Sequence, residues 1–241
     1  MLNSFTISKT LLTDQTLLAP QPQVGSTDTP FSKITTSRPQ IVKDLQKLAD
    51  HLAPHSKRIA YENWCWSTHA PDWADVWSIC QAVDRANFGL CLDTFQSAGG
   101  EWGDPTSQTG TLAGKSQTEV DEAFASSMQN LAATVPADKI YLLQISDAYK
   151  LKTPITEADA DGLRPRGRWS HDFRPVPFQG GYLPVVDVAR AVLKTGFRGW
   201  FSYEVFDSGE DGEGKEYDLD EYARTAFQCQ ERLMRECAEE K

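Results

Sequence analysis

Along this chain, short apolar runs typical of buried strands alternate with segments in which apolar residues recur at helical spacing. Short, mostly apolar runs predict strands at residues 15–19, 58–62, 88–93, 140–145 and 200–205. Between these runs apolar residues recur at helical spacing, as in Ile41, Leu45 and Leu48, which follow a predicted helix cap at Ser37 and precede a helix end at Pro54. Strands and helices therefore alternate, which is typical of a parallel sheet covered by helices.

The same patterns predict the remaining elements. Further amphipathic helices are predicted at 73–83, 118–131, 184–195 and 219–234, and Thr118 is the predicted cap of the second of these. Polar stretches rich in glycine, serine, threonine or proline are predicted to be loops, at 20–30, 96–117 and 149–183. No domain linker or low-complexity segment stands out, so residues 1–241 are expected to form a single domain.

Four consecutive predicted strands carry an oxygen-bearing side chain at or next to their last residue, namely Glu62, Asp93, Gln144 and Glu204. The carboxyl ends of parallel strands meet at one edge of a sheet, and in a β/α barrel that edge holds the active site. Three carboxylates that converge there repel one another unless a cation lies between them. A polar residue at a strand end is often only the first loop residue, so the argument depends on four in register. Oxygen ligands of this kind indicate Mg²⁺ or Mn²⁺.

The overall charge narrows the classes of partner. The formal net charge is −10 and the pI about 4.9, which argues against nucleic acid or an anionic membrane because binding to phosphates needs a basic face. The five cysteines fit no common zinc or disulfide spacing. No apolar run resembles a signal peptide or a membrane span. A cytoplasmic protein with free thiols is expected.

Several blocks of sequence are long and specific: RIAYENWCWSTH, NFGLCLDTFQ, KIYLLQISDA, LRPRGRWSHDFRPVP and GGYLPVVDVARAVLKTGFRGWFSYEVFD. They resemble the fungal 3-dehydroshikimate dehydratases of the xylose isomerase-like TIM-barrel superfamily, over about residues 38–235. The resemblance implies a divalent metal, Mg²⁺ or Mn²⁺, held by Glu62, Asp93, Gln144 and Glu204. It also implies the dehydration of 3-dehydroshikimate to protocatechuate in quinate and shikimate catabolism.

The substrate implied by this resemblance is a small carboxylated ring, which needs cationic partners. The segment LRPRGRWSHDFR supplies four arginines, and by resemblance Ser170 and Arg174 correspond to substrate-contacting positions. Arg164 is a further candidate for substrate binding, because an arginine fork pairs with a carboxylate through two parallel hydrogen bonds. The alternative is a solvated basic loop. Gln96, three residues after Asp93, is a candidate for lining the pocket.

The reaction also needs a group that transfers protons. Glu62 and His69 are the candidate catalytic residues, and His171 in the arginine-rich segment is an alternative to His69. Histidine suits this role because its ordinary pKa lies close to neutral pH. A surface or helix-capping role is the competing interpretation for each histidine.

The chain departs from the resembling family in length. A TIM barrel has eight strands, whereas five are predicted here, and residues 1–37 match the family poorly. The expected fold is therefore α/β, an incomplete TIM barrel of the xylose isomerase-like kind. Two hypotheses follow: a metal-dependent dehydratase, or a non-catalytic truncated paralogue. A sugar isomerase or epimerase is a weaker alternative, because those enzymes usually place histidine where Gln144 stands. Association into a homo-oligomer is left open.

Overall fold

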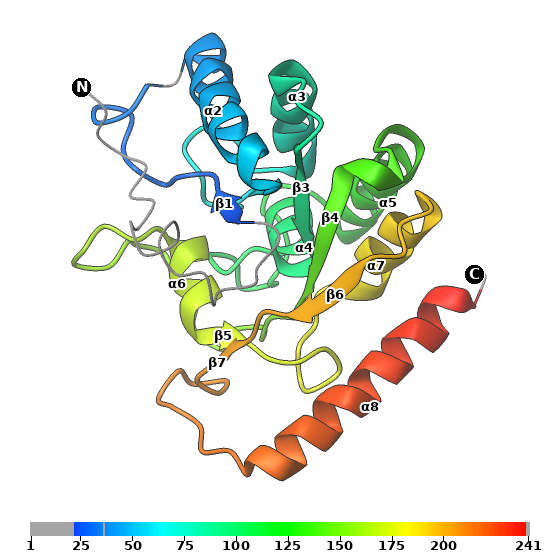
Figure 1. Ribbon diagram of the computed structural model, residues 1–241. Helices are drawn as coiled ribbons and strands as arrows, with labels where there is room; N and C mark the ends of the chain where they lie inside the picture. The colour runs from blue at the N-terminus through cyan, green and yellow to red at the C-terminus, as the bar shows by residue number, and fades with distance from the viewer. Residues whose placement is uncertain (1–21, 36, 240–241) are drawn as a thin grey trace.

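Five parallel strands form the central sheet, in the order β1–β2–β3–β4–β6 (Figure 1). The computed structural model describes residues 22–35 and 37–239. Within them the strands are β1 (Gln23–Gly25), β2 (Ile59–Glu62), β3 (Phe88–Asp93), β4 (Ile140–Ile145) and β6 (Trp200–Tyr203). The register sets Glu62 opposite Cys91, and Asp93 opposite Gln144. The carboxyl ends of the strands therefore lie along one edge of the sheet, as predicted.

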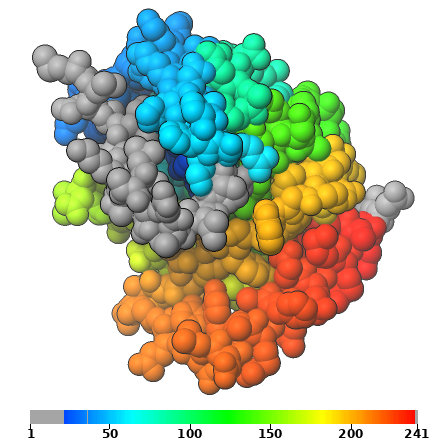
Figure 2. Space-filling view, in the orientation of Figure 1, coloured from blue at the N-terminus to red at the C-terminus, as the bar shows by residue number. Residues whose placement is uncertain are grey.

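Helices cover the outer face of this sheet. Those predicted from periodicity are confirmed as α2 (Arg38–Leu52), α3 (Trp73–Val83), α5 (Gln117–Thr134), α7 (Val185–Lys194) and α8 (Leu219–Ala238). Short 3₁₀ turns, η1 (Ala53–His55) and η2 (Ala137–Lys139), follow α2 and precede β4. Leu45, Val76 and Leu131 are buried in one core with the outward side chains of the strands. Helices α7 and α8 lie side by side below α5 (Figure 2).

The start of α5 differs from the prediction. Ser116, and not Thr118, is the cap: its hydroxyl accepts a hydrogen bond from the Glu119 N–H at 3.3 Å. Glu119 returns the contact, because its carboxylate accepts from the Ser116 N–H at 2.8 Å. This reciprocal capping box satisfies two N–H groups that the first turn of a helix otherwise leaves unpaired. A cap two residues earlier is therefore favoured.

Two segments predicted to be loops contain helices, so those predictions were wrong in part. Residues 96–117 begin within α4 (Thr94–Glu101), and residues 149–183 contain α6 (Pro165–Asp172) and the short strand β5 (Phe173–Arg174). The carboxylate of Asp93 caps α4 by accepting from the Phe95 N–H. Trp169 of α6 is fully buried, and its ring meets that of Phe95 at 5.1 Å between centroids. Tertiary burial of two aromatic residues therefore stabilises helices that the polar composition does not predict.

The first strand of the sheet also lies in a predicted loop, residues 20–30. β1 pairs in parallel with β2, and the bonds continue beyond it, since the Ser26 N–H donates to the Glu62 carbonyl at 2.8 Å. Val24 is the one large apolar residue in this strand of three, so no alternation is visible in the sequence. The predicted strand at 15–19 lies outside the described residues.

The sheet does not close into a barrel within the part of the chain that the structure describes. There, β1 and β6 are the two edge strands, and each pairs with one neighbour only. The antiparallel pair of β5 with β7 (Phe206–Asp207) forms a separate small sheet. Trp200 of β6, on the inner face, is 77% exposed. An aromatic residue of this kind is normally buried inside a closed barrel, so the interior is open along β6.

The described helices include none that is long and apolar enough to cross a lipid bilayer.

Candidate metal centre

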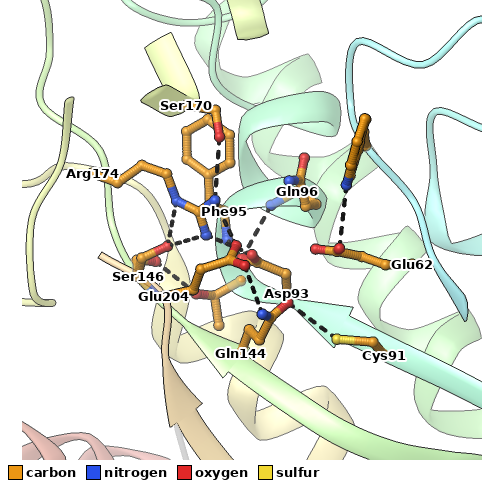
Figure 3. Close-up of polar contacts among 12 residues, drawn as sticks. Glu62, Cys91, Asp93, Phe95, Gln96, Gln144, Ser146, Ser170, Arg174 and Glu204 are labelled. Atoms are coloured by element: carbon orange, nitrogen blue, oxygen red, sulfur yellow. Dashed lines mark hydrogen bonds and ion pairs between the residues drawn. The ribbon is translucent and has the colours of Figure 1, made fainter. Parts of the chain in front are cut away.

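Three carboxylates converge at the carboxyl edge of the sheet (Figure 3). Glu62 ends β2, Asp93 ends β3, and Glu204 follows β6 directly. Each offers an oxygen within 4.8 Å of an oxygen of the other two. Glu62 is 2% exposed and Asp93 is fully buried. The strand-end pattern therefore brings together acidic side chains that are far apart in the sequence.

The two oxygens of Glu62 differ in their surroundings. Oε2 accepts hydrogen bonds from Gln23 Nε2 at 2.8 Å and from Trp64 Nε1 at 3.3 Å. Oε1 is buried and has no hydrogen-bond partner. A buried acceptor without a partner costs about 1–3 kcal/mol, and a proton on the carboxyl group or a bound cation would offset this cost. A metal ion at the centre of the three carboxylates would be such a cation.

Asp93 and Glu204 are each held by two kinds of donor. Asp93 Oδ1 accepts from the Phe95 N–H at 2.6 Å, and Oδ2 accepts from Arg174 Nη2 at 2.5 Å. Glu204 Oε2 accepts from Arg174 Nη1 at 2.8 Å, and Oε1 accepts from Gln144 Nε2 at 2.7 Å. Both carboxylates are therefore fixed in orientation before any ligand arrives.

Arg174 is the cation of the cluster. Its guanidinium is 1% exposed, lies 4.5 Å from the centre of the Phe95 ring, and donates to the hydroxyls of Ser146 and Ser170. Burial disfavours the charged guanidinium, but the charges of Asp93 and Glu204 outweigh this effect and raise the pKa of Arg174. When all three carboxylates are ionised, as binding of a cation requires, the cluster with its one guanidinium carries two negative charges. One divalent cation neutralises that charge.

Burial also changes the acidity of the carboxyl groups. Desolvation raises the pKa of Asp93 to about 7, although the charge of Arg174 acts in the opposite direction. Desolvation and then the charges of Asp93 and Glu204 raise the pKa of Glu62 well above its usual range. These raised pKa values favour the protonated carboxyl groups, and a cation bound among them would shift both groups toward the ionised form that can bind a metal.

Gln144 lies in the same cluster, as predicted for a fourth ligand. Its Nε2 donates to Glu204, and its Oε1 accepts from Cys91 Sγ at 3.1 Å and from Gln23 Nε2 at 3.2 Å. In this structure the amide therefore bridges its neighbours. Its role as a ligand stays a prediction.

The predicted substrate-binding residues are divided between two places. Ser170 and Arg174 contact each other at the cluster. Gln96 Oε1 accepts from the Cys65 N–H at 2.9 Å, which ties α4 to the loop after β2. Arg164 donates to the Trp66 carbonyl at 2.7 Å and to Thr68 Oγ1 at 2.9 Å, and it lines a cavity of about 300 Å³ with Trp66 and Arg166. Gln96 and Arg164 thus have structural contacts, and their substrate roles stay predictions.

The two candidate histidines contact different aromatic residues, and His69 is directed away from the carboxylates. The His69 Nε2 atom is 2.9 Å from the hydroxyl of Tyr61. Tyr61 belongs to the core on the outer face of β2, whereas its neighbour Glu62 faces inward. Burial, followed by the charge of Arg38, lowers the pKa of His69. The structure does not bring His69 to the cluster. The ring of His171 meets Trp66 edge-on at 6.4 Å.

Sequence reasoning missed Gln23, Trp64 and Ser146 as partners of the cluster. Ser146 had a visible signal: it follows Gln144 by two residues, so strand alternation directs both side chains to the same face. Gln23 had none, because its strand was not predicted. Trp64 was not predicted to hydrogen-bond Glu62.

The comparisons with known proteins agree with this geometry. The sequence profile of the xylose isomerase-like TIM barrel matches residues 10–232. The chain belongs to this family. A 3-dehydroshikimate dehydratase of Neurospora crassa is 37% identical over 203 residues, which are 80% of this chain and 55% of that protein. A 3-dehydroshikimate dehydratase of Pseudomonas aeruginosa is 29% identical over 169 residues, which are 70% of this chain and 21% of that protein.

Solved structures of the xylose isomerase-like TIM-barrel family confirm the fold. A fusion of a xylose isomerase-like TIM barrel with 4-hydroxyphenylpyruvate dioxygenase has a TM-score of 0.64 at 23% identity, over 87% of this chain and 27% of that one. The IOLI protein, solved with a bound zinc atom, has a TM-score of 0.58 at 19% identity, over 88% of this chain and 62% of that one. The predicted fold class is thus confirmed.

The chain spans about half the length of its fungal relative. Among the described residues the main sheet has five strands, whereas eight strands close a TIM barrel. The carboxylate cluster is nevertheless complete within those five strands, because β2, β3 and the end of β6 supply all three groups.

Proposed function

We propose that this chain carries the metal-binding part of a 3-dehydroshikimate dehydratase, a carbon–oxygen lyase that forms protocatechuate and water. The unpartnered, buried Oε1 of Glu62 among three carboxylates is the observation that carries the proposal. The names of the fungal and bacterial relatives supply the substrate. Cytoplasmic quinate and shikimate catabolism is the proposed setting.

A divalent metal is the proposed cofactor, held by Glu62, Asp93 and Glu204 with Gln144 as a fourth ligand. All these donors are oxygens, which favours Mg²⁺ or Mn²⁺, while the zinc atom in the IOLI protein supports a divalent metal in general. When bound, such an ion stabilises negative charge that develops on the substrate oxygens. The donor set fits it, because three carboxylates converge and Glu62 has a buried oxygen without a hydrogen-bond partner.

Arg174 and Ser170 are the proposed contacts for the substrate carboxylate. Arg174 already binds two carboxylates of the protein, and its other donors are engaged by Ser146 and Ser170, so a substrate carboxylate has to displace one of these partners. Its donors lie at fixed positions, since the hydroxyl of Ser146 accepts from Nε at 2.9 Å. A substrate carboxylate that replaces one of these partners would be oriented against the metal site.

The reaction removes one proton from a ring carbon and expels a neighbouring hydroxyl as water, so it needs a base and an acid. Glu62 is the proposed base, because its carboxylate lies where the three carboxylates converge. His171 is better placed than His69 for the acid role. The His171 ring contacts Trp66, and Trp66 stacks on Trp64 with 5.4 Å between ring centroids. Trp64 in turn donates to Glu62, so a series of contacts links His171 to the carboxylates.

Formation of protocatechuate from 3-dehydroshikimate, followed by ultraviolet absorbance, tests this proposal. The chain is assayed with Mg²⁺ or Mn²⁺, alone and extended at its amino end by the β/α units that complete the barrel of its relatives. Turnover that requires the metal and disappears in Glu62→Gln supports the dehydratase. Absence of turnover in both forms of the chain contradicts it.

A second candidate is a non-catalytic paralogue, and the open interior favours it. Trp200 is 77% exposed where a closed barrel buries its lining. A chain of this kind binds the divalent metal and the carboxylated ring but does not convert the ring. Metal binding without turnover in the extended chain distinguishes this candidate from the dehydratase.

A further inference from the structure

Two hydrogen-bond donors hold one oxygen of Glu62. Gln23 Nε2 lies 2.8 Å from Oε2, and Trp64 Nε1 lies 3.3 Å from the same atom. The two donors come from different parts of the chain: Gln23 opens β1, and Trp64 stands two residues after Glu62 itself. Together they leave Oε1 as the one buried oxygen of Glu62 without a partner.

We propose that Gln23 and Trp64 are positioning residues that fix Glu62 as a one-oxygen metal ligand. This inference rests on the metal site of the proposed function. A free carboxylate can bind a cation with both oxygens, but two donors on Oε2 keep that atom away from the metal. Ligation through one oxygen suits the octahedral geometry that Mg²⁺ demands. Partners outside the ligand shell commonly set ligand orientation in this way.

The surroundings of Trp64 support a fixed indole. Gly25 leaves space for it, because a Cβ at that position would lie 2.4 Å from the Trp64 ring. The indole ring stacks on Trp66 with an interplanar angle of 16°. The backbone N–H of Trp64 donates to Ser26 Oγ at 2.8 Å. β1 therefore contributes to the site in two ways. The side-chain amide of Gln23 donates to Glu62, and Gly25, which has no side chain, leaves room for the Trp64 ring.

Gln23 also connects Glu62 to the other predicted amide ligand. Its Nε2 lies 3.2 Å from Gln144 Oε1, and its own Oε1 accepts from Gln144 Nε2 at 3.4 Å. Gln144 in turn donates to Glu204. The side chain of Gln23 thus links the ends of β2 and β4, and its loss removes hydrogen bonds from two predicted ligand side chains at once.

Titration of the chain with Mn²⁺, followed by calorimetry or electron paramagnetic resonance, tests the proposal in Gln23→Leu and Trp64→Phe. We expect the Mn²⁺ dissociation constant to rise about 10–100-fold in Gln23→Leu, and by a smaller factor of at least about three in Trp64→Phe. The thermal unfolding midpoint without metal shows whether each variant is still folded, so that a loss of affinity is separated from a loss of structure. The tryptophan variant separates positioning from ligation, because an indole can only donate and cannot bind a cation through its nitrogen.

Two control variants each remove an indole or an amide side chain that makes a hydrogen bond outside the carboxylate cluster. Trp102→Phe deletes an indole that donates to the Asp121 carboxylate at 2.7 Å, and Gln46→Leu deletes an amide that donates to the Val83 carbonyl at 3.1 Å. Both should bind Mn²⁺ as the parent does. Parent-like affinity in either Gln23→Leu or Trp64→Phe overturns the pairwise positioning and leaves the dehydratase proposal standing. A parent chain that binds no Mn²⁺ overturns both proposals.

Discussion

Arg174 and Asp93 form a buried ion pair, with 2.5 Å between Nη2 and Oδ2 and at most 1% of either side chain exposed. Removing one member leaves the other charge without a partner in a dry environment. We therefore expect Arg174→Met to lower the free energy of unfolding by about 3–5 kcal/mol, measured by urea denaturation in EDTA. Arg224→Met, at an exposed site on α8, is the control. A loss below about 1 kcal/mol would show that the pair contributes little.

Glu204 should be needed for metal binding. It contributes one of the three converging oxygens, and it also orients Gln144 and Arg174. We expect Glu204→Ala to weaken Mg²⁺ or Mn²⁺ binding at least about tenfold in calorimetry, because it removes both a charge and a ligand. Glu213→Ala, in the exposed acidic loop, should bind the metal as the parent does. Unchanged affinity in Glu204→Ala would remove this residue from the ligand set.

Glu101 should make the stability depend on pH. Burial between α4 and α5 raises its pKa from 4.5 to about 7, and its Oε1 has no hydrogen-bond partner. The folded protein therefore holds a proton that the unfolded chain releases above about pH 4.5. The stability from this proton is fully present below that pH and is lost as the pH rises through 7.

Glu101→Gln keeps the neutral form at every pH. We expect the variant to match the parent near pH 4.5 and to be more stable by about 2–3 kcal/mol at pH 8. Urea denaturation across this range measures the difference, and Glu122→Gln at an exposed site of α5 is the control. A constant difference between parent and variant across the range would contradict the burial argument.

The open interior should limit catalysis. Water that enters along β6 would raise the effective dielectric and weaken the proposed contacts of the metal and of Arg174 with substrate. A displacement of about 1 Å can cost roughly a hundredfold in rate. We therefore expect the 241-residue chain to form protocatechuate slowly or not at all, and the extended chain to be active. Family-like turnover by the chain alone would contradict this, and would indicate closure by a second copy or by its own amino-terminal segment.

The sequence alone determined which strands deliver the acidic groups. Glu62, Asp93 and Glu204 end apolar runs, and the parallel arrangement follows from the alternation of strands and helices. These features are local: a strand or an amphipathic helix shows its period within a few residues. The long helices were predictable for the same reason, because each must bury one apolar face.

The tertiary structure alone decided the partners of those groups. Gln23 reaches Glu62 because β1 pairs with β2, and Arg174 reaches Asp93 because α6 buries Trp169 against Phe95. Neither segment shows a period, so contacts between residues far apart in sequence, and not local preference, set their conformation. The same holds for His69, which the loop after β2 directs to Tyr61 and away from the carboxylates. The position of a strand end can be predicted from the local pattern of apolar residues. Which side chains meet at that end depends on packing between segments that are distant in the sequence.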